Sequence, residues 1–462
     1  MSRQRAAAWL AAVLLAAPLS LAGPLSPGAQ GQVQASPSPT WSQAREPGAD
    51  LVVYLMTMGE GDLVWERFGH NAIWIHDPVA GTDHTYHWGL FDFDEPGFIR
   101  EFVQGRMYYS MGAAHADDMV RAYMRANRSV WIQELELMPR QRQALADFVA
   151  WNIRPENRFY HYDYYHDNCS TRVRDALDRA LGGQILAQTG GLPSGYTFRD
   201  HTRRVTTNDL LTYTGLMAGL SQGVDHEISV WEEMFLPLSM RERVRHITVT
   251  DDDGRELPLV RSEQTLFVAD RPPLRQQPPR WWPGYLLVGL AAAMLILGTG
   301  HLAARSVGAR GVAARAGAGA IGGLWMLAAG LLGVVLVGLW GFTDHAAAYR
   351  NENLLLFNPL ALPLAVLFPL LMGGRGGARL ERWTVGLALV VAVAGVLGVV
   401  FKLLPWFHQV NGELLALAVP IHMAVAAVSW LLVHQRTGPG RDAGPAHSGT
   451  DRITGSVPCA RR

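Results

Sequence analysis

One stretch, residues 160–172, reads YHYDYYHDNCSTR and contains Cys169, one of the two cysteines in the 462-residue chain. Apolar residues recur after it at helical spacing, at Val173, Ala176, Leu177 and Ala180. This spacing predicts a helix, and Asn168 is a good N-cap residue, so Cys169 is expected in the first turn. Backbone N–H groups and the positive end of a helix dipole favour a thiolate there. We therefore predict that Cys169 is a nucleophile, the alternative being a buried, inert cysteine.

The composition changes sharply along the chain. Residues 48–270 are polar, aromatic and charged, and residues 271–284 connect them to a second part. That part, residues 285–434, consists mostly of Leu, Ala, Val and Gly with few charges. The composition therefore predicts a domain outside the membrane followed by a membrane domain. Formal net charge is zero, so no nucleic-acid partner is indicated.

Both ends of the chain are expected to lie outside these two domains. Residues 1–23 carry two arginines before an apolar run and small residues, which is typical of a signal peptide or a retained N-terminal anchor. Residues 24–47 are rich in Pro, Ser, Gly and Gln and are expected to form a flexible linker. Residues 435–462, which include Cys459, are expected to form a disordered cytoplasmic tail.

Five segments are long and apolar enough to span a membrane. They cover residues 285–303, 317–342, 354–372, 383–404 and 414–433. Arginines gather between the first and second segments, between the third and fourth, and after the fifth. The positive-inside rule places those loops and the C-terminus in the cytoplasm and the first domain outside. The N-terminal signal requires the same orientation.

The loops 343–353 and 405–413 are then expected on the same side of the membrane as Cys169. The first contains His345, Glu352 and Asn353, for which we predict contact with substrate or lipid headgroups. The alternative is an ordinary polar loop.

Two further candidates lie on strands expected upstream of Cys169. His70 begins an apolar, β-prone segment, and the next such segment carries His87, with His84 as the alternative. A thiol nucleophile needs a base and a polar group that orients the base. Cys169, His70 and His87 supply these three roles. The sequence shows no strong metal-ligand spacing, and we predict neither a metal nor a cofactor.

The order of histidine before cysteine is similar to that of the circularly permuted NlpC/P60 group, which includes lecithin–retinol acyltransferase-like enzymes. Longer motifs resemble the Lnb-type lipoprotein N-acyltransferases, in which an exported thiol domain is fused to C-terminal membrane helices. They are RFGHNA at 67–72, YHWGLFDF at 86–93, DNCSTR at 167–172, FLP at 235–237 and NENLL at 351–355. The family commonly has Asn where this chain has His87, although a histidine can also orient a catalytic histidine.

The resemblance implies an α+β, permuted papain/NlpC-P60-like periplasmic domain followed by an all-α domain of five transmembrane helices in the inner membrane. It implies that Cys169 takes an acyl chain from a phospholipid as a thioester and passes it to the α-amine of a diacylglyceryl-cysteine on a lipoprotein. His70 would be the general base. Asn168 and Arg172 are further candidates for substrate contact, Arg172 through a lipid phosphate, and an ordinary helix-surface charge is the alternative for Arg172.

Two rival functions use the same sequence features. The first is an exported cysteine amidase or peptidase that acts on peptidoglycan with the same three residues, although one membrane anchor would suffice for it. The second is a non-enzymatic membrane assembly factor in which Cys169 is structural. The sequence does not indicate an oligomeric state.

Overall fold

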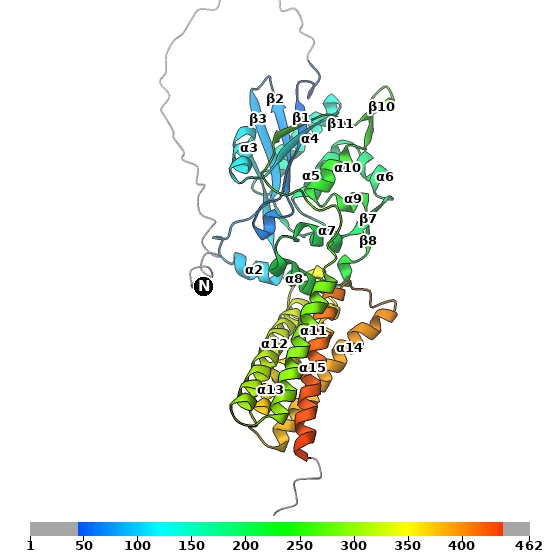
Figure 1. Ribbon diagram of the computed structural model, residues 1–462. Coiled ribbons are helices and arrows are strands. Elements are labelled where there is room, and N and C mark those ends of the chain that lie inside the picture. The colour runs from blue at the N-terminus through cyan, green and yellow to red at the C-terminus, as the bar shows by residue number, and fades with distance from the viewer. Residues whose placement is uncertain (1–44, 438–462) are drawn as a thin grey trace, which may run out of the picture. The chain divides into compact units, whose positions relative to one another are not determined.

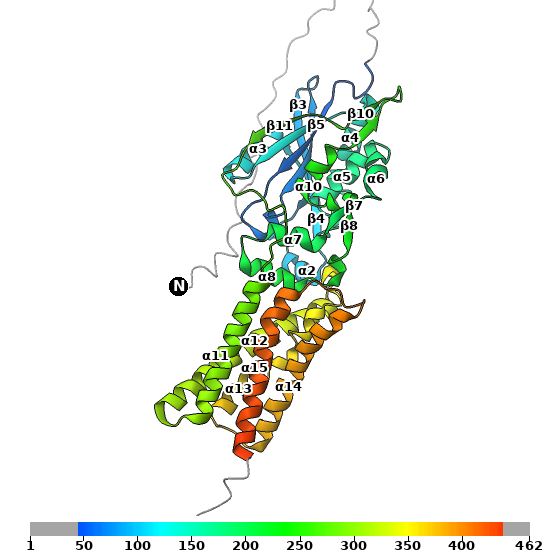
Figure 2. The ribbon, with the colours of Figure 1, turned by 45° about the vertical axis from the view of Figure 1, so that its right-hand side comes forward.

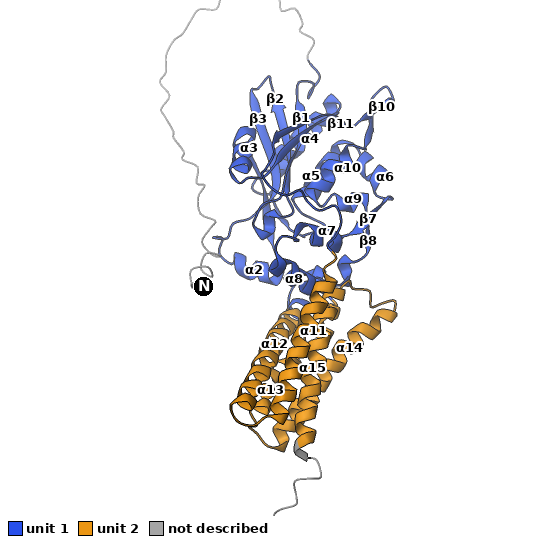
Figure 3. Ribbon diagram, viewed as in Figure 1, with its two compact units in different colours: residues 1–279, 339–349 blue, residues 280–338, 350–462 orange. Residues whose placement is uncertain are grey.

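The computed structural model describes residues 45–437. The expected signal at 1–23, nearly all of the linker at 24–47 and the tail with Cys459 lie outside the described residues. The chain divides into two compact units, shown in Figure 3. Unit 1 comprises Met1–Pro279 and Leu339–Tyr349, and unit 2 comprises Arg280–Gly338 and Arg350–Arg462.

Unit 1 is built on an antiparallel sheet, and its described residues contribute seven strands in the order β11-β5-β1-β2-β3-β4-β6 (Figure 1). These are β1 (Val52–Met58), β2 (His70–Asp77), β3 (Thr82–Leu90), β4 (Tyr108–His115), β5 (Val130–Leu135), β6 (Phe159–His161) and β11 (Val260–Phe267). Two short pairs lie outside this sheet, formed by β7 (Pro193–Thr197) with β8 (Glu227–Ser229) and by β9 (Thr248–Thr250) with β10 (Glu256–Pro258). The expected strand that begins with His70 is therefore confirmed.

Helices surround this sheet without alternating regularly with its strands, so the unit is α+β, as predicted. The helices are α2 (Phe98–Gln104), α3 (Ala116–Arg125), α4 (Pro139–Asn152), α5 (Cys169–Ala180), α6 (Gln184–Thr189), α7 (Phe198–Val205), α8 (Leu210–Gly219), α9 (Val230–Glu233) and α10 (Pro237–Val244). Short 3₁₀ turns occupy η1 (Val64–Glu66) and η2 (Gln222–Val224). The helix predicted to begin at Cys169 is confirmed as α5.

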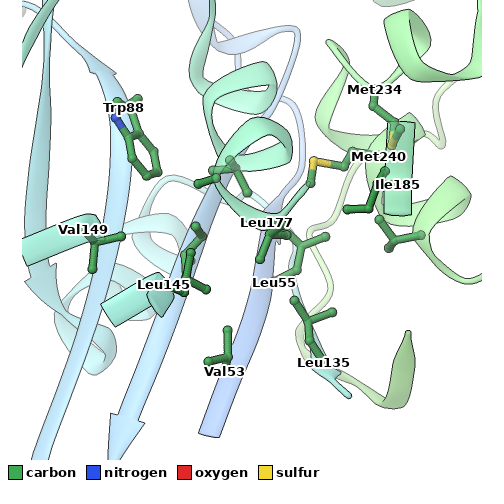
Figure 4. Packing of buried hydrophobic residues seen from close by; sticks show 14 of the residues in the cluster. Val53, Leu55, Trp88, Leu135, Leu145, Val149, Leu177, Ile185, Met234 and Met240 are labelled. Atoms are coloured by element: carbon green, nitrogen blue, oxygen red, sulfur yellow. The ribbon is translucent and has the colours of Figure 1, made fainter. Parts of the chain in front are cut away.

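The sheet has an apolar core on each face, because side chains alternate between the two faces along a strand. On one face, Leu55 of β1 shares a core with Leu145 of α4 and Leu177 of α5 (Figure 4). On the other face, Met56 shares a smaller core with Met119 of α3. The helix that carries Cys169 is thereby held against the sheet that carries the two histidines.

Unit 2 is helical, and its helices are drawn from a second direction in Figure 2. They are α11 (Trp282–Arg305), α12 (Gly308–Phe342), α13 (Leu364–Met372), α14 (Ala378–Val400) and α15 (Gly412–Thr437). Short 3₁₀ turns in this unit are η4 (Glu352–Leu355), η5 (Pro359–Ala361) and η6 (Phe401–Leu403), whereas η3 (Ala346–Ala348) belongs to unit 1. Four helices in the described part are long and apolar enough to span a membrane, and five if one bent pair is counted as a span.

That bent pair occupies the third span expected over residues 354–372. The arm Glu352–Ala361 and the arm Leu364–Met372 meet at 59°. Pro363 lies at the break and Pro359 lies in the first arm, and a proline supplies no N–H for a helical hydrogen bond. In the described part of the chain, four of the five expected spans are therefore single helices, and the third is this bent pair.

Candidate active site

Cys169 is the first residue of α5, and Asn168 caps that helix. The side-chain oxygen of Asn168 accepts the N–H groups of Ser170 at 2.8 Å and Thr171 at 2.9 Å. Its amide nitrogen donates to two backbone carbonyls at 3.0 and 3.1 Å. Both ends of the Asn168 amide are thus bound within the protein, and this side chain fixes the position of Cys169.

The Cys169 sulfur faces three backbone N–H groups, which belong to Asn71 of β2, to Cys169 itself and to Ser170. Burial has the largest effect and raises the pKa of the Cys169 thiol to about 11, while these N–H groups and the charge of Arg128 act in the opposite direction. The resting group at neutral pH is therefore a thiol. A negative charge that develops at this point during a reaction would find donors already in place.

His70 and His87 lie side by side on neighbouring strands. Nε2 of His70 is 3.0 Å from Nδ1 of His87, and the two rings are nearly perpendicular. His84, the alternative orienting residue, points to the other face by strand alternation and is exposed. The structure thus brings His87, and not His84, to His70.

Both imidazoles are neutral at physiological pH. Burial lowers the pKa of His87 to about 4. Burial also lowers the pKa of His70 well below 6.5, and the charges of His87 and Arg128 lower it further. A neutral imidazole can accept a proton, so His70 has the protonation state that a general base needs.

The two residues that follow the candidate base and nucleophile are bonded to each other. Nδ2 of Asn71 donates to Oγ of Ser170 at 2.9 Å, and Oδ1 of Asn71 accepts the hydroxyl of Thr57 at 2.8 Å. All three side chains are buried. The described residues show no direct hydrogen bond between Cys169 and His70, so the connection between them is made by this neighbouring pair and by the Asn71 N–H.

Gly89 of β3 lets α5 approach the sheet. Its φ of +89° lies in the left-handed region, which favours glycine. A Cβ at this position would stand 3.3 Å from the Cβ of Cys169 and 3.7 Å from the ring of Tyr162. The glycine in the YHWGLFDF motif is therefore explained by the close packing of β3 against the cysteine.

Two family models match this chain, and they divide it much as the structure does. The model described as the Lnb N-terminal periplasmic domain matches residues 38–207, which contain all three candidate catalytic residues, and the model described as the Lnb transmembrane domain matches residues 302–435. The chain is an Lnb-type protein. Its domains indicate a membrane-associated protein that processes lipoproteins, located in the inner membrane with a periplasmic first domain, and family membership points to an N-acyltransferase. Comparisons with curated proteins and with solved structures found no match.

A second layer of this Lnb-type protein supports the His70 ring. Tyr123 of α3 stacks on His70, with ring planes 16° apart and centroids separated by 6.3 Å. The guanidinium of Arg128 lies 4.5 Å from the centre of the Tyr123 ring and pairs with Glu66 at 3.4 Å. Sequence reasoning missed Tyr123 and Arg128, because no local pattern marks them and only the fold brings α3 to the His70 face of the sheet.

Arg172 is held by its own loop. It forms a two-point ion pair with Asp167, one bond of which measures 2.6 Å, and its guanidinium lies 4.1 Å from the centre of the Tyr160 ring. About a third of its side chain is exposed. Contact with a lipid phosphate stays a prediction, and it would have to compete with the Asp167 pair.

The three residues predicted from the outward loop fall into different units. His345 belongs to unit 1, where its Nε2 lies 3.0 Å from the carbonyl oxygen of Phe102. Glu352 and Asn353 belong to unit 2 and are buried. Glu352 pairs with Lys402, and Asn353 accepts an amide hydrogen bond from a neighbouring loop at 2.9 Å. Their contact with substrate stays a prediction.

The described side chains give no sign of a metal site. Between residues 45 and 435, no three His, Cys, Asp or Glu side chains are grouped closely enough to hold an ion. The groups that this Lnb-type site offers for chemistry are its thiol, its two imidazoles and its backbone donors.

Proposed function

We propose that this Lnb-type protein is a lipoprotein N-acyltransferase that carries the acyl group on Cys169 as a thioester. The observation that carries the proposal is the His70–His87 pair, 3.0 Å apart, beside the helix start that bears Cys169. The order of a histidine strand before the cysteine helix also supports a permuted NlpC/P60-like arrangement. The membrane domain supports substrates whose acyl chains lie in lipid.

The tautomer of His70 follows from its partner. If Nε2 of His70 carries the ring proton and donates a hydrogen bond to Nδ1 of His87, then Nδ1 of His70 has a free lone pair. That nitrogen is the one available to accept the proton of the Cys169 thiol. His87 thus acts as the orienting group, the role that a polar residue plays in other thiol enzymes.

The first half-reaction transfers the acyl group to the enzyme. His70 takes the thiol proton as the Cys169 sulfur attacks the ester carbonyl of a phospholipid, and the carbonyl oxygen becomes an oxyanion. Backbone N–H groups at the start of α5 are the donors available to stabilise that oxyanion. The tetrahedral intermediate collapses, the ester C–O bond breaks, and His70 returns its proton to the departing lysophospholipid alcohol. The products are the lysolipid and the Cys169 thioester.

The second half-reaction uses the same groups in the opposite direction. The α-amine of a diacylglyceryl-cysteine attacks the thioester carbonyl, and His70 accepts a proton from the amine. The C–S bond breaks, the amide forms, and the sulfur leaves and regains its proton from His70. The net change is one ester converted into one amide, so the reaction needs neither a cofactor nor an oxidant.

The orientation in the membrane belongs to the same proposal. Both substrates expose their reacting groups at the outer surface of the inner membrane, where the periplasmic domain lies. If the bent pair of unit 2 crosses the membrane once, five crossings place the C-terminus in the cytoplasm. The partners are then a phospholipid acyl donor, a lipoprotein acceptor and the membrane itself.

The test is mass spectrometry of lipoprotein N-terminal peptides from a strain that lacks lipoprotein N-acylation. We expect the wild-type chain to add one acyl group to the terminal amine, and Cys169→Ala and His70→Ala to add none. His84→Ala is the matched control, because His84 is exposed on the other face, and we expect it to behave as the wild type.

Other results would favour the rival functions. Stable membrane protein that leaves the amine free, together with release of peptides from peptidoglycan fragments, would support the amidase. Full complementation by Cys169→Ser would support an assembly factor in which the cysteine is structural.

A further inference from the structure

Helix α2 presents a partly exposed apolar surface. The exposed fractions of Ile99, Phe102 and Val103 are 54%, 40% and 58%. Phe98, one turn before Phe102, is buried in the larger core of unit 1. Large apolar side chains gathered on one short helix are costly in water, and this arrangement is typical of a surface that contacts another apolar phase.

The chain ties this helix to the end of a membrane span. The backbone N–H of Asp344 donates to the carbonyl of Gln104, the last residue of α2, at 2.7 Å. Arg106 pairs with Asp344 at 2.8 Å. Since α12 ends at Phe342, the residue bonded to α2 follows the end of this helix by two positions, or roughly 7 Å of chain. The covalent chain and these two bonds therefore keep α2 close to the C-terminal end of α12.

Helix α8 supports the same placement. Its first two residues, Leu210 and Leu211, are 58% and 85% exposed. Just beyond its other end, the N–H of Ser221 donates to the carbonyl of Ala347 at 2.7 Å, in the same segment that holds α2. Figures 1 and 2 both show α2 and α8 at the same end of unit 1.

Aromatic rings connect α2 with the candidate nucleophile. Phe98 stacks on Tyr109 of β4 with centroids 6.4 Å apart, and Tyr109 lies 4.4 Å from Tyr162. Tyr162 and Cys169 both border Gly89. These contacting rings belong to the apolar core of unit 1 and connect the exposed helix with the residues beside the sulfur.

We propose that α2, together with the first turn of α8, inserts into the outer surface of the phospholipid bilayer and presents the lipid acyl ester to Cys169. The occupant of this apolar surface is the lipid of the membrane that α12 spans. The exposure of these apolar side chains and the chain connectivity support the insertion, whereas the delivery of an ester rests on the proposed acyl transfer.

Insertion is tested on the full-length protein in nanodiscs of phosphatidylethanolamine and phosphatidylglycerol. The starting variant, C169A/C459A, contains no cysteine. A single cysteine is then introduced at position 99, 103 or 79, in place of Ile99, Val103 or Val79, and is labelled with an environment-sensitive fluorophore. Val79 is the matched control, because it is 71% exposed in the turn between β2 and β3. Lipids brominated near the headgroup are expected to quench the labels at 99 and 103 at least about threefold more than the label at 79.

Equal quenching at all three positions would overturn the insertion. Disulfide formation between two copies of I99C, without lipid quenching, would overturn it too and would show that α2 docks on a second copy of the chain. Because two positions on α2 are labelled separately, a change in quenching that is seen at only one of them can be recognised as an effect of that substitution.

Delivery is tested separately with the I99D/V103D variant on the wild-type Cys169 background. We expect at least a tenfold loss of thioester formation from bilayer phospholipid and less than a twofold loss from a dissolved short-chain phospholipid, which needs no interfacial contact. Equal losses with both substrates would overturn delivery by α2. If neither the wild type nor the variant forms a thioester, the proposed function fails, while the quenching result still decides the insertion.

Discussion

Each unit of this protein contains a buried polar network where two segments meet, and the two networks are closed in different ways. In unit 1, Asn71 of β2 is bonded to Ser170 of α5. In unit 2, Glu352 pairs with Lys402 and accepts the N–H of Gln409 at 2.9 Å. The side chain of Gln409 in turn accepts the N–H of Glu352 at 2.8 Å.

The two networks differ in whether they leave a neighbouring group able to react. In unit 2 the carboxylate, the ammonium and the amide groups are bonded to one another, as polar groups in an apolar surrounding must be. In unit 1 the bonded pair lies one residue beyond a thiol and an imidazole, and the sulfur receives only backbone donors. A buried polar network therefore indicates a reactive site when it positions a reactive group without bonding to that group. It indicates a packing role when its groups bond only to one another.

The largest effect should come from removing the thiol. Cys169→Ser keeps the shape of the side chain but offers a hydroxyl that is far less acidic than a thiol. We expect no acyl adduct by intact-protein mass spectrometry after incubation with phospholipid. The wild type should gain one acyl mass that hydroxylamine removes. A stable adduct on the wild type that resists hydroxylamine would contradict a thioester.

Next in size is the loss of the base. His70→Ala should slow thioester formation by about 100- to 10,000-fold, the usual contribution of a general base. His87→Asn keeps a polar partner for His70 and restores the residue common in the family, so we expect a smaller loss than with His87→Ala. Rates measured by acyl-adduct formation will order the three variants. If His70→Ala forms the thioester as fast as the wild type, the buried network of unit 1 does not mark a reactive site.

The pH dependence should show that both imidazoles are neutral. Their pKa values are lowered from 6.5, to about 4 for His87 and well below 6.5 for His70. The rate of thioester formation should therefore persist below pH 6 and fall, by about tenfold per pH unit, only as the pH approaches 4. Stability should fall earlier, between pH 6.5 and about 4, because the unfolded chain takes up protons from pH 6.5 downward and the folded chain does not. An acid limb centred at 6.5 would contradict these environments.

A moderate effect is expected from breaking the network of unit 1. Asn71→Ala leaves the buried hydroxyls of Ser170 and Thr57 short of a partner, which should cost about 1–3 kcal/mol of unfolding free energy. Thioester formation should slow as well, since the bond between β2 and α5 is lost. Gln143→Ala is the control, because Gln143 makes an exposed side-chain bond on α4, and it should change stability by less than about 0.5 kcal/mol. Denaturant unfolding followed by Trp fluorescence measures both.

The smallest effect on chemistry should come from the network of unit 2. Lys402→Met leaves Glu352 buried without its cation and should destabilise unit 2 by about 3–5 kcal/mol, while Lys402→Met with Glu352→Gln should recover much of that loss. Thioester formation from a dissolved short-chain lipid should change by less than about twofold in all of these variants, because the two sites lie in different units. A raised KM in Glu352→Gln, with unchanged thermal stability, would instead favour the predicted contact with substrate.

Much of the fold could be predicted from local patterns. The start of α5 follows from Asn168 and the helical spacing after Cys169, and the strand expected to begin with His70 is β2. Four of the five expected spans are single helices. These features depend on residues close in sequence, whose periodicity, capping and length are visible without a tertiary structure.

The candidate site shows where such reasoning stops. The sequence indicated Cys169 and His70, but it left His84 and His87 as alternatives for the orienting group, and only the pairing of β2 with β3 brought His87 to His70. Tyr123 lies on a helix that becomes a neighbour of His70 only when α3 packs on the sheet.

The sequence by itself therefore determined which residue types can carry the chemistry, because a thiol at a helix start and an apolar span are local properties. The tertiary structure decided the rest. It assigned Leu339–Tyr349 to unit 1, bonded Glu352 to Lys402 and joined Asn71 to Ser170. These contacts connect residues far apart in the chain, and their partners are selected by packing and by the need to satisfy buried polar groups, which no local pattern records.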